Sequence, residues 1–127
     1  MDNAAATSMR TQLAVFSAIV LGIDVLGLGG IAVHIVTSLE TFEIIFADMG
    51  ARLPGLTRLV LSVGTVGWCA ILGAAAMGLV VKEALIRQPG IRLGINVVGA
   101  LIAGILFEVY RYALMAPMYG MVEALQQ

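Results

Sequence analysis

The chain has 127 residues, of which 61% are hydrophobic and 12% are charged, and its formal net charge is −1. Soluble domains carry about 25% charged residues, so half that share leaves too few charges to cover a water-facing surface. The near-neutral charge gives no reason to expect nucleic acid as a partner, and the single cysteine, Cys69, excludes an internal disulfide.

Three long apolar stretches, residues 13–37, 59–81 and 93–118, occupy most of the chain. A hydrocarbon core of about 30 Å needs about 20 helical residues at about 1.5 Å each, so each stretch is long enough to cross a bilayer. Backbone in lipid must satisfy its own hydrogen bonds, and these stretches lack the period-two alternation of barrel strands. The sequence therefore predicts a single all-α membrane domain with three transmembrane helices embedded in a lipid bilayer.

Basic residues are concentrated on two of the segments outside these spans. Residues 1–12 and 119–127 are predicted to be short tails, and residues 82–92 a tight hydrophilic turn that contains the breaker pair Pro89-Gly90. The first tail and this turn carry Arg10, Lys82, Arg87 and Arg92. The positive-inside rule then predicts a cytoplasmic N-terminus and an outside C-terminus in a bacterial inner (cytoplasmic) membrane.

The connector at residues 38–57 has helical periodicity. Its apolar residues recur at the i, i+3, i+4 and i+7 spacing of one helix face, which predicts a short amphipathic interfacial helix that lies flat between spans one and two. Gly50 is expected to end it. The helix could only set the angle between the spans, or it could dock a partner through Phe42, Ile45, Phe46, Met49, Leu53 and Pro54.

The same connector resembles a known family. Residues 42–58 read FEIIFADMGARLPGLTR, which is similar to the pattern F-x3-F-x3-G-x2-LP-x2-T(R) of the inner-membrane platform (F) proteins of type II secretion and type IV pilus machines. The resemblance implies a non-cytoplasmic connection between two spans. The large cytoplasmic domains of that family have no counterpart here, so the resemblance extends to a three-span membrane module and not to secretion activity.

Two ionisable residues stand out in span one. Asp24 lies near its middle, where a charge costs about 2.5–3.5 kcal/mol on insertion scales, so it is expected to be neutral, paired or directed into protein. His34 follows ten residues later, close to three turns, so the two residues roughly share a face. Together they form a candidate ion or proton site, although a structural hydrogen bond for Asp24 and an interfacial position for His34 are the simpler readings.

Span three carries a candidate structural ion pair, Glu108 and Arg111, at i and i+3. Spans two and three also contain small residues at four-residue spacing, which let helices approach closely. The predicted packing positions are Ala70, Ala74, Gly78, Gly99, Ala103 and Gly104.

The sequence shows no nucleophile–base pair, phosphate loop or Cys/His cluster, so we expect neither an enzyme nor a metal site. It favours a non-enzymatic accessory or assembly subunit that packs against other membrane proteins as a hetero- or homo-oligomer. One alternative is a small homo-oligomeric channel or ion-coupled subunit that uses Asp24. No cofactor is expected, and the remaining alternative is a subunit that binds haem or chlorophyll through His34.

Overall fold

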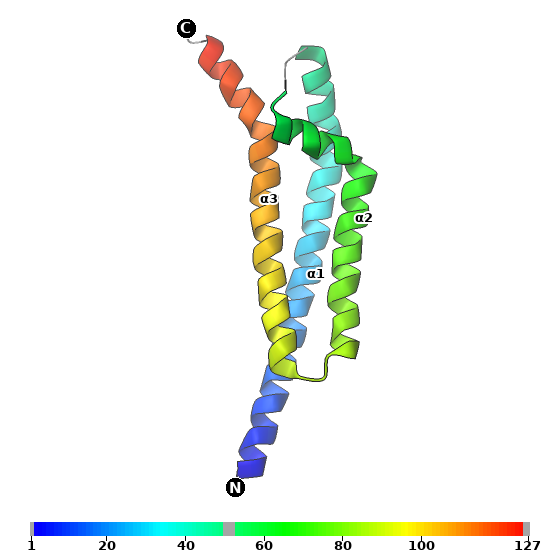
Figure 1. Ribbon diagram of the computed structural model, residues 1–127, viewed down its shortest axis with the longest axis vertical. Helices are drawn as coiled ribbons and strands as arrows, with labels where there is room; N and C mark the ends of the chain where they lie inside the picture. Colours follow the sequence, from blue (N-terminus) through cyan, green and yellow to red (C-terminus); the bar gives the residue numbers. More distant parts are fainter. Residues whose placement is uncertain (1, 50–52, 126–127) are drawn as a thin grey trace.

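The computed structural model describes the backbone of residues 2–49 and 53–125, and the side chains of residues 3–48, 53–120, 122 and 123. It consists of three α-helices, α1 (Asp2–Met49), α2 (Gly55–Leu85) and α3 (Pro89–Leu125), which lie side by side in an elongated bundle (Figure 1). Each helix contains a stretch long and apolar enough to cross a membrane. The prediction of three helices long and apolar enough to span a membrane is therefore confirmed, and it indicates a multi-pass protein in contact with lipid.

Different segments of the chain lie at the two ends of the bundle. The N-terminal part of α1 extends past the α2–α3 loop at one end, and the last part of α3 lies with the end of α1 and the start of α2 at the other (Figure 1). The α2–α3 loop is only Ile86 to Gln88, shorter than the predicted turn at 82–92. Residues 82–85 complete α2, and Pro89 begins α3, where its missing N–H costs nothing. The predicted tails are also helical as far as residues 2–49 and 53–125 describe them.

The predicted interfacial helix at 38–57 does not occur as a separate element, which corrects that part of the fold. Residues 38–49 continue α1 without a break. The hydroxyls of Thr37, Ser38 and Thr41 all donate to carbonyls three or four residues earlier, so none of them offers the backbone an alternative to the helix. Gly50, the expected stop, lies outside the described residues.

A sharp bend divides α2 at Gly64, whose backbone angles are φ 66° and ψ 168°. Positive φ is strained for residues with a Cβ and open to glycine. The bend disrupts the helical hydrogen-bond ladder, and the indole N–H of Trp68 donates to the Val60 carbonyl at 3.1 Å. The residues before Gly64 consequently run crosswise over α1 and α3 rather than along them (Figure 1).

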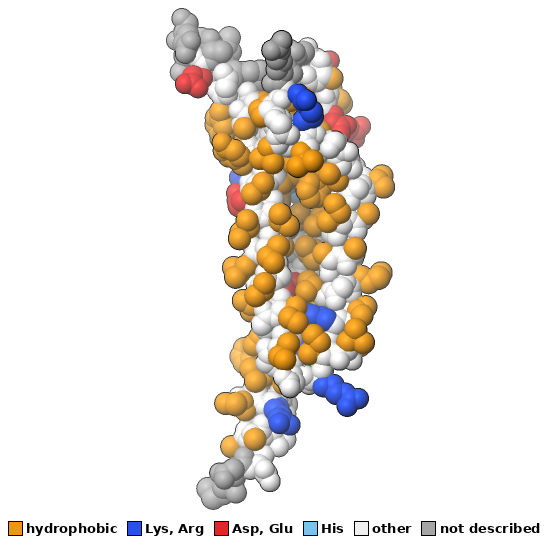
Figure 2. Space-filling view, viewed as in Figure 1, with side chains coloured by type: hydrophobic (Ala, Val, Ile, Leu, Met, Phe, Trp, Pro, Cys, Tyr) orange, Lys and Arg blue, Asp and Glu red, His pale blue; other side chains and the backbone are white. Residues whose placement is uncertain are grey.

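The best-buried core lies under this crosswise segment. It comprises Ile35, Leu39, Phe46, Val60, Tyr110, Ala113 and Leu114. Thr57, fully buried, donates to the Ala113 carbonyl at 2.6 Å and so fastens the start of α2 to α3. Over their whole described length, α2 and α3 both pack mainly on α1 and contact each other less. The surface of the bundle is dominated by hydrophobic side chains (Figure 2).

Candidate functional site

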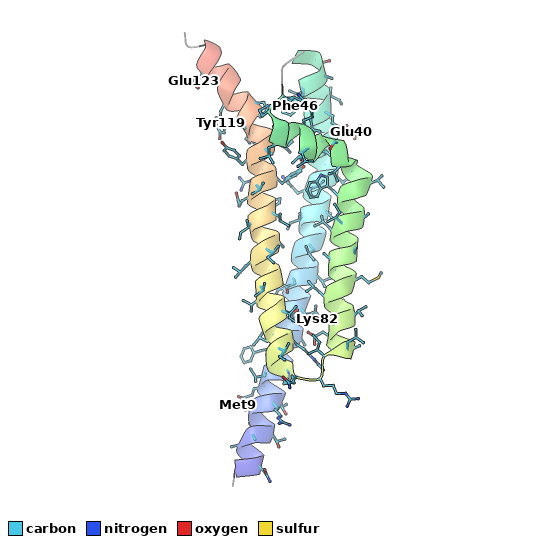
Figure 3. All side chains as sticks on the ribbon, viewed as in Figure 1. Met9, Glu40, Phe46, Lys82, Tyr119 and Glu123 are labelled. Atoms are coloured by element: carbon cyan, nitrogen blue, oxygen red, sulfur yellow. The ribbon has the colours of Figure 1, made fainter. Side chains whose placement is uncertain are left out.

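Polar side chains from all three helices meet near the α2–α3 loop, at the level of the labelled Lys82 (Figure 3). We call Ser17, Lys82, Glu83, Arg92 and Asn96 the Glu83 cluster. Glu83 Oε1 accepts hydrogen bonds from Lys82 Nζ at 2.8 Å and Ser17 Oγ at 3.0 Å, and from Asn96 Nδ2 at 3.2 Å. Glu83 Oε2 lies 3.3 Å from Arg92 NH1. One carboxylate thus links α1, α2 and α3.

Most side chains of the Glu83 cluster are buried, so their hydrogen bonds and ion pairs matter for stability. Ser17, Lys82 and Asn96 are all more than nine-tenths buried, and a buried charge is costly unless it is paired and hydrogen-bonded. Lys82 meets this demand with Glu83 and with the Arg92 carbonyl at 3.3 Å. Asn96 Nδ2 also donates to the Ser17 carbonyl at 3.0 Å, whereas its Oδ1 is buried without a partner in the described residues.

Asp24 lies two turns beyond Ser17 on α1, about 10 Å along the helix. It is 7% exposed, and its Oδ2 is buried without a hydrogen-bond partner in the described part of the chain. Asp24 lines a cavity of about 220 Å³ between α1 and α3, whose α3 wall is made of Gly99, Ala100, Ala103 and Gly104. Lys82 Nζ donates to Glu83 and makes no hydrogen bond to Asp24 in the described part of the chain.

A second, larger hollow of about 420 Å³ runs between α2 and α3. We call it the α2–α3 groove. Its floor is α1, its walls include Gly78 and Gly99, and its apolar lining ends in Lys82 on one side and in Trp68 with Tyr110 on the other. The groove and the Asp24 cavity are adjacent, because they share the lining residues Leu28, Ile31, Leu79, Gly99 and Ala103.

His34 belongs to an aromatic group and not to the Asp24 site. Its ring meets Phe107 edge-on with 5.4 Å between centroids, and Tyr110 at 6.4 Å. Ten residues of helix separate His34 from Asp24 by about 15 Å, so the two predicted ion-site residues are not brought together. Within the described side chains, no three His, Cys, Asp or Glu residues are grouped so that they could hold a metal ion.

The predicted docking face on residues 42–54 is used mainly inside the chain. Phe46 is 4% exposed in the core, and Phe42, Ile45 and Leu53 pack against it. Pro54 is exposed, and the side chain of Met49 lies outside the described residues. The sequence pattern correctly marked an apolar helix face, but most of that face is covered by the chain's own crosswise segment and α3.

The predicted packing residues divide between the two hollows and the outer surface. Gly78, Gly99 and Ala103 line the α2–α3 groove, and Gly104 lines the Asp24 cavity with Gly99 and Ala103. Ala70 and Ala74 are exposed and line neither hollow. Glu108 and Arg111 form an ion pair at 3.0 Å on the outer face of α3, with both side chains more than half exposed.

Sequence reasoning missed the Glu83 cluster. It treated Lys82 and Arg92 only as positive charges of a turn, and it did not single out Ser17, Glu83 or Asn96. The usable signal was a serine and an asparagine inside apolar spans, since polar side chains at membrane depth commonly bond across helices. Their shared level along the bundle is visible only once the helices are placed together.

Comparisons of the chain with protein-family models, with curated proteins and with solved structures give no match. Function must therefore be argued from the two hollows and the buried polar groups. Neither hollow brings together a nucleophile, a general base and an electrophile stabiliser among the described residues. What the arrangement offers is an apolar groove, a cavity with one unpaired carboxylate, and close-approach surfaces built on glycine.

Proposed function

We propose that this protein is a non-enzymatic assembly subunit of a membrane complex, and that it receives a transmembrane helix of another chain in the α2–α3 groove. The observation that carries this proposal is the groove itself. Two helices that pack mainly on a third leave between them an apolar hollow of about 420 Å³. The groove is open to the outside of the bundle, so side chains of a neighbouring helix can enter it.

The residues that line the groove favour the side chains of a partner's helix as its occupant. Gly78 on α2 and Gly99 on α3 lie in opposite walls, and small residues let a neighbouring backbone come close. A Cβ added to Gly78 would meet no atom of the described chain within 4 Å, although glycine costs about 1 kcal/mol relative to alanine in a helix. No contact within the described chain accounts for glycine at this position, whereas an approaching partner would.

The expected setting is a bacterial inner membrane, with the N-terminus and the α2–α3 loop in the cytoplasm. Arg10, Lys82, Arg87 and Arg92 support this orientation through the positive-inside rule. The resemblance of residues 42–58 to secretion and pilus platform proteins suggests one kind of complex, and an energy-converting assembly is another.

Site-specific photo-crosslinking in the native membrane tests the proposal. A photoreactive amino acid at Ile102, which lines the groove, is expected to give a discrete adduct with another polypeptide, because the partner's side chains lie within reach. Ile105 is the matched control, since it is on the same helix and 64% exposed but lines neither hollow. Lipid adducts alone at both positions would contradict the proposal.

A further inference from the structure

We infer that the Asp24 cavity is the site where a partner's transmembrane helix inserts a lysine or arginine side chain, whose charged end bonds to the Asp24 carboxylate. This inference rests on the proposed function and names the chemistry of the partner. It concerns the cavity between α1 and α3, which is lined by Asp24 and small or aliphatic residues, and not the contents of the α2–α3 groove.

Asp24 lies at a depth where an unpaired carboxylate is costly. Arg92 and Arg111 are about 28 Å apart along α3, close to the thickness of a hydrocarbon core. The α3 residues that line the cavity, from Gly99 to Gly104, fall midway between them. Ionisable side chains at this depth normally pair with one another or with polar groups, yet Asp24 Oδ2 accepts no hydrogen bond in the described chain.

Three basic side chains of α2 and α3 are already bonded to other groups of the described chain. Lys82 donates to Glu83 and to the Arg92 carbonyl. Arg92 pairs with Glu83 and also donates to the Ile86 carbonyl, and Arg111 is bound to Glu108 on the outer face of α3. A hydrogen-bond donor for the Asp24 carboxylate is therefore expected to come from another molecule.

The lining of the cavity favours a long side chain over a free ion or water. Asp24 is the only described lining residue with a polar side chain. An ordered water needs two to four polar partners, and hard cations need several oxygen ligands. A lysine or arginine supplies its own hydrocarbon stem, which suits apolar walls such as Leu28, Ile31 and Leu79, and carries its charge to the far end.

The rim of the cavity allows a helix to approach closely enough. Gly27 on α1 and Gly104 on α3 both line it, and a Cβ added to either would meet no atom of the described chain within 4 Å. Glycine at these two helical positions lets the backbone of a neighbouring helix come near. The unpaired carboxylate and the open glycine rim thus indicate the same neighbour.

The test measures binding of synthetic transmembrane peptides to the full-length protein in phosphatidylcholine vesicles. The peptides are leucine–alanine helices that carry one central lysine or one central leucine, and a dansyl group accepts energy from Trp68, the single tryptophan of the chain. The lysine peptide is expected to bind about tenfold more tightly than the leucine peptide, in line with polar contacts between membrane helices. Asp24→Asn, which keeps the shape of the side chain, is expected to reduce this preference to less than about twofold.

Three further variants distinguish loss of the contact from loss of the fold. Gly104→Leu is expected to fill the open rim and to abolish the preference, whereas Gly73→Leu, at an open α2 position that lines neither hollow, leaves it intact. In the charge swap, Asp24→Lys is expected to bind a peptide with a central aspartate.

Equal binding of the lysine and leucine peptides to the unaltered protein would overturn the inference. Asp24-dependent ion flux without any peptide preference would overturn it in favour of an ion site. A missing preference combined with polypeptide adducts at Ile102 would reject this inference alone and leave the proposed function standing.

Discussion

At the residue scale, the ion pairs of Glu83 and the Glu108–Arg111 pair are expected to differ in their contribution to stability. Glu83 pairs with Lys82 and Arg92 and also accepts a hydrogen bond from Ser17 of α1, and the Lys82 and Glu83 side chains are only 10% and 20% exposed. Glu83→Ala would leave the buried Lys82 ammonium without its carboxylate partner, so we expect the free energy of unfolding to fall by about 3 kcal/mol. Reversible unfolding in mixed detergent–SDS micelles, followed by Trp68 fluorescence, measures this loss.

Glu108→Ala is the matched control. Its partner Arg111 is three residues away on the same helix, and both side chains are more than half exposed, so we expect the free energy of unfolding to fall by less than about 0.5 kcal/mol. Similar losses for Glu83→Ala and Glu108→Ala would show that the Glu83 cluster does not hold the helices together.

The sequence identifies several single residues of structural interest, but it does not predict which residues of other helices they contact. Asp24 was identifiable from its depth in span one, and the Glu108–Arg111 pair from its spacing, because both signals lie within one helix. Glu83, Ser17 and Asn96 come from three helices, and no spacing within one helix predicts that their side chains meet. The spacing predicts that His34 roughly shares a helical face with Asp24, but about 15 Å of helix separates the two residues, and the His34 ring contacts Phe107 and Tyr110 instead.

At the element scale, the bend at Gly64 determines how α2 leaves the α1–α2 connection. Gly64→Ala would force a Cβ into a conformation with φ 66° and ψ 168°, a region that is essentially restricted to glycine and costs other residues about 1–3 kcal/mol. Straightening of α2 would instead remove the Trp68–Val60 hydrogen bond and pull Thr57 away from Ala113. Either outcome lowers the free energy of unfolding in the same micelle assay.

Gly73→Ala is the comparison variant for the bend. Gly73 is helical and its added Cβ would meet no described atom within 4 Å, so we expect no loss and a gain of up to about 1 kcal/mol from helix propensity. A Gly64→Ala protein as stable as the Gly73→Ala protein would contradict the account of the bend.

Element boundaries followed the sequence only where breakers were strong. Pro89 ended the α2–α3 loop near the expected turn, since proline suits a helix start. In the connector, the apolar periodicity of residues 42–49 was read as a separate helix, but no breaker precedes it after span one and α1 simply continues. The crosswise segment is the beginning of α2, and the sequence did not predict it, because the apolar run at residues 59–81 contains four glycines, of which Gly64 alone has a positive φ.

At the scale of the whole molecule, composition and span length decided the architecture. Residues 13–37, 59–81 and 93–118 all fall within the three helices, because a bilayer fixes the length that an apolar helix must have. The packing of those helices against one another was not predictable from the sequence, since lipid-facing and protein-facing positions are equally apolar. The groove and the Asp24 cavity both arise from that packing.

The most direct test of the account is the accessibility of introduced cysteines to a membrane-impermeant maleimide, in a chain whose Cys69 is replaced by alanine. We expect Glu43→Cys to react from outside intact cells, Gln88→Cys to react only after permeabilisation, and Ile105→Cys, 64% exposed in the middle of α3, to stay unreactive in both. Reaction of Ile105→Cys as fast as Gln88→Cys in permeabilised cells would contradict the account, because water rather than lipid would then surround these helices.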